Sequence, residues 1–207
     1  ASTSPSKPSP SICELTPFDP RNLSIARYNH QMTEVIFSRD TLKAQLERAR
    51  FERAIEVAES LAQHRALLTT TELARLNNIL TGRQPTDEPW RQGPASLKLR
   101  SGKEIQFAVM ADPKINLREK LHQATETAES GNVLDALVYL YSNMILSHYF
   151  SDANRRTAAI AAHYFAQRYA LPLSGLAIHE MGLGDLREEG RIEALRSTLE
   201  SMLRVSR

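Results

Sequence analysis

The chain of 207 residues has little of what marks several common classes of protein. Its only cysteine is Cys13, which excludes an intrachain disulfide and a zinc site built from several cysteines. No apolar run approaches the roughly 20 residues that a membrane-spanning helix needs. The formal net charge is only +2 and the arginines are spread along the chain, which argues against a nucleic-acid-binding protein. We therefore expect neither nucleic acid nor a membrane among its partners.

The start of the chain lacks an initiator methionine and the pattern of a signal peptide. Residues 1–10 consist almost entirely of Ser, Thr, Pro and Lys, and such a segment cannot bury enough apolar surface to fold. We predict a disordered linker over residues 1–16 and a single helical domain over residues 17–207. These features favour a domain cut from a longer protein.

Helical patterns dominate the rest of the chain. Asp40, Thr70 and Asn132 are the expected N-caps of three helices, and Gly82 and Pro172 are the expected ends of two. The predicted helices cover residues 20–37, 41–67, 72–80, 117–129, 133–148, 154–169, 176–181 and 190–205.

Two of these helices have clear apolar stripes. In the helix over 41–67 the expected inward stripe is Leu42, Leu46, Ala49, Arg53, Val57 and Leu61. In the helix over 133–148 the stripe is the strongest in the chain, with Leu134, Leu137, Val138, Tyr141, Met144 and Ile145. We expect this second helix to be the central core helix, with His148 at its C-terminal end.

One β signal stands among the helices. Residues 96–99 and 104–109 alternate in polarity and are separated by a four-residue turn that contains Gly102. A lone two-stranded hairpin is only marginally stable in water, so it must lie against the helices or a ligand. The predicted fold class is all-α with one β-hairpin.

A short run of chemically reactive side chains follows the most apolar helix and leads into the next one. It supplies a base in His148, a carboxylate in Asp152, an amide in Asn154 and guanidiniums in Arg155 and Arg156. The first amides of the second helix have no intrahelical partner and carry partial positive charge. Cations at that end oppose the helix dipole and make better anion ligands than helix stabilisers. A base, a hard oxygen suited to Mg²⁺ and several cationic groups indicate phosphoryl-group chemistry.

The run over residues 148–156, His-Tyr-Phe-Ser-Asp-Ala-Asn-Arg-Arg, resembles the signature of the Fic/Doc family. The commoner form of that signature is His-Pro-Phe-x-(Asp/Glu)-Gly-Asn-Gly-Arg. The resemblance implies a Fic-type helical bundle with a core over about 69–171. The hairpin resembles the family's flap, which aligns target segments by strand addition.

The same resemblance implies the roles of individual residues. His148 would be the catalytic base that takes the proton of a target hydroxyl, and Asp152 would hold Mg²⁺ on the nucleotide phosphates. The phosphate- and nucleotide-binding group would comprise Ala153, Asn154, Arg155 and Arg156. The target-docking flap would use Leu97, Leu99, Ile105 and Phe107.

Departures from the commoner signature bear on the transferred group. Ala153 and Arg155 replace two glycines, and Tyr149 replaces proline, which resembles the Doc branch that transfers phosphate alone. The length of the chain and its linker instead resemble a bacterial effector module. We rank transfer of UMP or AMP from UTP or ATP to a protein Ser, Thr or Tyr hydroxyl first. Doc-like phosphotransfer comes second, and an inactive Fic scaffold that only binds partners is the rival from another class.

The effector resemblance implies where the protein acts and on what. The expected target is a host kinase or GTPase, and the expected location is the cytoplasm or, after secretion, the host cell. Residues 125–130 and 185–190 each miss one position of the family's inhibitory motif, and Ala159 stands where that motif's partner arginine would be. We therefore do not expect the family's usual intramolecular inhibition.

Overall fold

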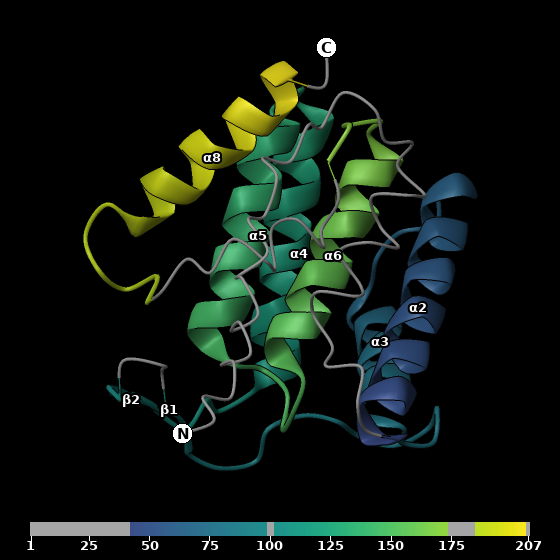
Figure 1. The fold of residues 1–207 in the computed structure, drawn as a ribbon, viewed down its shortest axis with the longest axis vertical. Coiled ribbons are helices and arrows are strands. Elements are labelled where there is room, and N and C mark those ends of the chain that lie inside the picture. The colour runs from purple at the N-terminus through teal and green to yellow at the C-terminus, as the bar shows by residue number, and fades with distance from the viewer. Residues whose placement is uncertain (1–41, 99–101, 174–184, 206–207) are drawn as a thin grey trace, which may run out of the picture.

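The computed structural model describes residues 42–98, 102–173 and 185–205. These residues form a bundle of helices with one β-hairpin, so the predicted fold class is confirmed (Figure 1). The helices are α2 (Leu42–Gln63), α3 (Thr70–Thr81), α4 (Pro113–Glu129), α5 (Val133–Ser147), α6 (Asn154–Arg168) and α8 (Arg191–Val205), and the strands are β1 (Ala95–Lys98) and β2 (Glu104–Phe107). Among these helices none is long and apolar enough to cross a membrane. The linker over 1–16 and the helices predicted over 20–37 and 176–181 lie outside the described residues.

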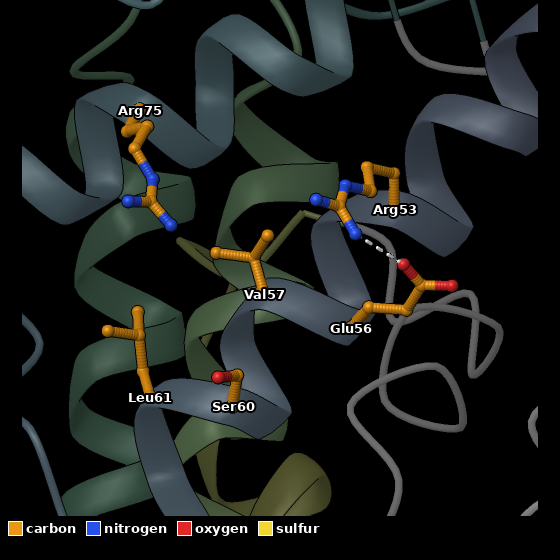
Figure 2. Close-up of a pocket in the computed structure, with 6 residues that line it drawn as sticks. All are labelled: Arg53, Glu56, Val57, Ser60, Leu61 and Arg75. Carbon is orange, nitrogen blue, oxygen red and sulfur yellow. Dashed lines mark hydrogen bonds and ion pairs between the residues drawn. The ribbon is translucent and has the colours of Figure 1, made fainter. Parts of the chain in front are cut away.

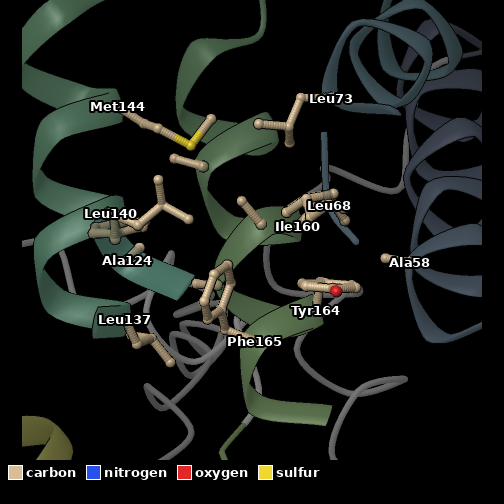
Figure 3. Close-up of a cluster of buried hydrophobic side chains, with 14 of the residues drawn as sticks. Ala58, Leu68, Leu73, Ala124, Leu137, Leu140, Met144, Ile160, Tyr164 and Phe165 are labelled. Atoms are coloured by element: carbon tan, nitrogen blue, oxygen red, sulfur yellow. The ribbon is translucent and has the colours of Figure 1, made fainter. Parts of the chain in front are cut away.

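The core forms where α5 and α6 meet. Helix α5 packs against α4, α6 and α8, and α2 packs against α3 and α6. Figure 3 shows Leu137, Leu140 and Met144 of α5 facing Ile160 and Phe165 of α6. Every residue of α6 from 157 to 166 is buried, whereas only one side of α5 is. Helix α6 is thus the more enclosed of the two, because its many alanines let neighbouring helices approach closely on several sides.

Helix α2 buries a different face from the predicted one. Leu42 is 73% exposed and Leu46 is 48% exposed, so the predicted stripe was wrong. The buried face of α2 consists of Phe51, Ala54, Ile55, Ala58 and Ala62. This row is mostly small, which lets α2 lie close to the alanine-rich surface of α6. The helix also ends at Gln63, four residues before the predicted end.

Helix α3 begins at Thr70, two residues before its predicted start at residue 72. Thr69, not Thr70, is the N-cap, and its Oγ1 accepts a hydrogen bond of 3.2 Å from the backbone N–H of Glu72. Gly82 ends the helix as predicted, with a φ of 72° in the left-handed region. The two helix ends are therefore set by local side-chain and backbone chemistry.

Helices α4 and α5 also have identifiable starts. Asp112 caps α4 by accepting a hydrogen bond of 2.9 Å from the N–H of Ile115. The helix begins at Pro113, four residues before the predicted start at Leu117, because proline suits the first helical turn. Asn132 stands at the N-cap position of α5 as predicted, although its side chain makes no capping hydrogen bond.

The hairpin lies with one face against the helices, as its marginal stability requires. Leu97 pairs with Ile105 in the antiparallel register, and Phe107 lies on the same face. Ile105 and Phe107 are buried and Leu97 is partly exposed. The buried side chains hold the hairpin on the domain, so an outward contact with a target would use the backbone edge. Leu99 lies outside the described residues.

A segment before α8 also contacts the hairpin. Lys103 lies 3.0 Å from a carboxylate oxygen of the buried Asp185 and 3.5 Å from one of Glu188. The guanidinium of Arg187 lies 6.0 Å from the centre of the Phe107 ring. Hydrogen bonding to Arg187, followed by that to Lys103, keeps the pKa of Asp185 far below its usual range. Asp185 therefore stays ionised across the physiological pH range.

Candidate active site

The reactive run forms the connection between α5 and α6. His148 is the C-cap of α5, with φ 54° and ψ 59°, and its N–H donates to the carbonyl of Met144 at 3.3 Å. This left-handed conformation ends the helix and starts the loop. The His148 imidazole stacks on the ring of Phe107, with ring centres 4.3 Å apart. The predicted base therefore lies directly beside the flap.

The environment of His148 favours its neutral form. Burial lowers the pKa of the imidazole, and the positive charge of Arg91 lowers it further. The carboxylate of Asp152 opposes this effect. Because a neutral imidazole can accept a proton, His148 is suited to act as a general base near neutral pH.

Asn154 closes the loop onto itself. Its Oδ1 accepts a hydrogen bond of 2.8 Å from the N–H of Phe150, and its Nδ2 donates one of 2.7 Å to the carbonyl of the same residue. The side chain is buried, with 5% of the residue exposed. In this structure the amide fixes the shape of the loop. Its contact with a phosphate stays a prediction.

The loop leads into an open helix start. Ala153 is the N-cap of α6, with a φ of 56°, and it has no polar side chain with which to cap the first-turn amides. Uncapped amides at a helix start attract anions. The exposed Asp152 stands just before them, and its Oδ1 accepts a hydrogen bond of 2.5 Å from the N–H of Ala153. The loop thus places one carboxylate beside a cluster of positive dipoles.

The two arginines of the run point to different neighbours. The Nη1 of Arg156 lies 3.8 Å from Oε2 of Glu47 on α2, and it has no hydrogen-bond partner within the described part of the chain. Burial raises the pKa of the Tyr141 hydroxyl, and the nearby guanidinium of Arg155 opposes this rise. Arg155 therefore lies beside Tyr141 of α5, while Arg156 faces α2. The buried Nη1 of Arg156 would be satisfied by an anion oxygen.

A short backbone pairing supports the loop from the side of the hairpin. Trp90 and Phe150 form an isolated antiparallel β-bridge, and their rings stack with centres 5.0 Å apart. The N–H of Ser151 donates to the carbonyl of Pro89 at 2.9 Å. The segment before the hairpin is therefore joined to the reactive loop by backbone hydrogen bonds and a ring contact.

Two polar residues of the site gave no signal in the sequence. The buried Asn77 of α3 donates to the backbone carbonyl of Asp152 and to Oγ1 of Thr157, both at 2.9 Å. Arg91, also buried, donates to the backbone around His148. Asn77 lies in an amphipathic helix and Arg91 in a loop, where polar residues are usually exposed, and neither has a motif that would mark it.

The single carboxylate of Asp152 fits a magnesium ion whose other ligands are phosphate oxygens and water. No group of three or more His, Cys, Asp or Glu side chains that could bind a metal occurs among the described residues. Mg²⁺ needs only one or two carboxylates when phosphates and water complete its shell. The exposed carboxylate of Asp152, beside the open start of α6, meets this requirement.

A pocket of about 240 Å³ lies elsewhere, between α2 and α3 (Figure 2). Its lining consists of Arg53, Glu56, Val57, Ser60, Leu61 and Arg75. Both arginines are engaged by neighbouring glutamates of their own helices. None of the residues of the reactive loop lines this pocket, so it has no part in the chemistry discussed here.

The fold and the loop define a helical domain that carries a histidine base and an uncapped helix start within one short segment. Residues 67–166 match the family model described as Fic/DOC family. The chain is also similar in structure to a Fic domain-containing signalling protein from Bacteroides thetaiotaomicron, with a TM-score of 0.64, 17% sequence identity, and coverage of 89% of this chain and 78% of that one. No curated protein matches the chain.

The match to the Fic/DOC family model over residues 67–166 confirms the resemblance drawn from the loop. The matched residues agree closely with the core predicted over 69–171. The structural likeness, at its low identity, supports the fold alone. The family match supports a transferase of the Fic type in general terms.

Proposed function

We propose that the domain transfers a nucleoside monophosphate, UMP or AMP, from UTP or ATP to a Ser, Thr or Tyr hydroxyl of a target protein. The observation that carries the proposal is the position of His148. It lies beside the flap, with a lowered pKa, at the start of a loop that ends in an uncapped helix. The base and the proposed anion site thus share one short segment, and the flap lies beside its first residue.

In the proposed reaction His148 accepts the proton of the target hydroxyl while that oxygen attacks the α-phosphorus. A new oxygen–phosphorus bond forms, the bond to the β-phosphate oxygen breaks, and pyrophosphate leaves. Positioning and charge stabilisation supply most of the catalysis in such reactions. The amides of residues 154–156 and the guanidinium of Arg156 would neutralise charge on the phosphates.

Asp152 would hold Mg²⁺, which when bound adds positive charge to the phosphates. The carboxylate is exposed and stands just before the anion-binding amides, so a metal held there would contact phosphate and water. Arg156 would exchange its long ionic contact with Glu47 for a shorter one to a phosphate oxygen. Asp152 and Arg156 both belong to the run over residues 148–156.

The flap would guide the acceptor to the base. Phe107 ends β2 and stacks on His148, so a target segment added to the backbone edge of the hairpin would pass beside the imidazole. An exposed hairpin edge suits a polypeptide acceptor better than a small metabolite. We propose a host kinase or GTPase as the target of a secreted effector that acts in the host cell.

Phosphotransfer of the Doc type is the second candidate. It is favoured by Ala153 and Arg155, which stand where the commoner signature has glycines. Ala153 keeps the left-handed conformation that glycine adopts easily, at a cost of roughly 1–2 kcal/mol, and its methyl group narrows the approach to the backbone. A nucleotide bound in the reverse direction would present its terminal phosphate instead.

Radiolabelled nucleotides separate the candidates. The domain is incubated with a target-cell lysate and with ATP, UTP, CTP or GTP labelled at the α or the γ position. The proposal predicts α-label on protein and none from the γ position, whereas γ-label alone would favour phosphotransfer. A binding module would leave no label and would retain its partner after His148→Ala.

A further inference from the structure

Arg91 has more hydrogen bonds to backbone carbonyls than a loop arginine ordinarily makes. It is buried, with 8% of the residue exposed. Its guanidinium donates to the carbonyls of His148 (2.7 Å), Gly93 (2.6 Å), Phe107 (3.5 Å), Ala108 (2.9 Å) and Ser147 (3.3 Å). These acceptors come from three parts of the chain: the end of α5, the end of β2 and the segment that leads into β1.

The positive charge of Arg91 faces the partial negative charges of backbone carbonyl oxygens. Within the described residues, every hydrogen-bond acceptor of this guanidinium is a backbone carbonyl. Ser147 and His148 stand at the C-terminal end of α5, where unpaired carbonyls carry partial negative charge. A guanidinium suits this place because its five donors fan out in a fixed plane. A lysine has the charge without that geometry.

We propose that Arg91 is a positioning residue for the transfer reaction, one that fixes the flap relative to the base. The inference rests on the function proposed above. One planar group bonds both to the carbonyl of His148 and to those of Phe107 and Ala108. It therefore sets the separation between the backbone that would carry the acceptor segment and the imidazole that takes its proton.

The chemistry makes this separation critical. A general base must be within hydrogen-bond reach of the hydroxyl, and a displacement of about 1 Å can cost about 100-fold in rate. The acceptor would be held by the flap and the nucleotide by the loop and α6. Loss of Arg91 should therefore impair the catalytic step with a protein acceptor more than it impairs nucleotide binding.

The kinetic test compares Arg91→Gln and Arg91→Lys with the surface control Arg118→Gln, whose arginine is exposed on α4. For both Arg91 variants we expect kcat for protein modification to fall by about 10- to 100-fold. The Kd for nucleotide, measured by calorimetry, should stay within about twofold of the wild-type value, and the control should match the wild type. An unchanged kcat, or equal losses in kcat and nucleotide affinity, would overturn the proposal.

A second measurement keeps the proposal testable if the proposed function fails. Hydrogen–deuterium exchange of the nucleotide-free protein should be faster in Arg91→Gln at residues 104–108, with the helices α4 and α6 unchanged. Equal protection of the hairpin in both proteins would overturn the coupling of flap and base, whatever the domain transfers. Failure of both Arg91 variants to fold would overturn it as well, because the residue would then serve stability alone.

Discussion

The two ends of the reactive loop are built differently. At the first end, His148 is stacked on Phe107, and its backbone is bonded to Arg91. At the other end, Arg156 makes one ionic contact of 3.8 Å with Glu47, and its buried Nη1 has no hydrogen-bond partner among the described residues. The end proposed to accept the proton is already held in place, whereas the end proposed to bind phosphate retains a buried donor without a hydrogen-bond partner among the described residues. Such a division suits an enzyme whose nucleotide completes the site.

The largest expected effect comes from removing the imidazole of His148. His148→Ala should lower kcat by about 10²- to 10⁴-fold, because general-base catalysis contributes that much. Nucleotide affinity should stay within about twofold, since we propose that the phosphates bind at the other end of the loop. Arg156→Ala should show the opposite pattern, with a clear loss of nucleotide affinity. The comparison breaks down if His148→Ala weakens nucleotide binding as much as Arg156→Ala does.

The next effect concerns the residue that closes the loop. Asn154→Ala removes both hydrogen bonds to the backbone of Phe150 and leaves buried groups unpaired, so the free energy of unfolding should fall by about 2–3 kcal/mol. Urea denaturation measures this change. Asn132→Ala is the matched control, because that side chain makes no capping hydrogen bond, and its effect should stay below about 0.5 kcal/mol. Equal losses in the two variants would show that Asn154 does not hold the loop.

The pH dependence of the reaction tests the state of the base. His148 must be neutral to accept a proton, and burial together with Arg91 lowers its pKa. Transfer under kcat/KM conditions should therefore stay constant as the pH falls below about 6.5, the usual value for histidine. It should then fall by about tenfold per pH unit below the lowered pKa. A decline that begins above the usual value would contradict the assigned environment.

The smallest expected effect concerns the buried Nη1 of Arg156, which faces Glu47. Glu47→Gln removes the charge that faces Arg156, so the guanidinium should bind nucleotide about two- to fivefold more tightly, within the range of a partly exposed ion pair. Glu52→Gln on the same helix, whose partner is Arg48, is the control and should leave affinity unchanged. Calorimetry with a non-hydrolysable nucleotide measures both. Identical affinities in the two variants would mean that Glu47 does not compete with phosphate.

Much of this architecture was predictable from local patterns. The spacing of apolar residues placed α5 and α6, and the alternation of polarity placed the hairpin. The loop between the helices is short, so its residues had to lie near one another whatever the rest of the fold. Gly82 ends α3 through contacts with residues three and four positions away, as predicted, whereas the local cap at Asp112 and the start of α4 were missed.

The remaining features depend on contacts between distant residues. Helix α2 has two apolar rows, and periodicity alone could not decide which one meets α6. Arg91 and His148 are 57 positions apart, and Asn77 and Asp152 are 75 positions apart. In the sequence Arg91 and Asn77 are ordinary polar residues, and only the folded chain places their donors against backbone carbonyls of the site. The supports of a reactive loop are harder to predict than the loop itself for this reason.

The central claim, transfer of a nucleoside monophosphate with His148 as base, is tested most directly by intact mass spectrometry of a modified target. A target protein captured from a host lysate is incubated with wild-type domain or His148→Ala, Mg²⁺ and either UTP or ATP. We predict a mass gain equal to one UMP or AMP residue with the wild type and none with the variant. A gain equal to phosphate alone, or the same gain with both proteins, would contradict the account.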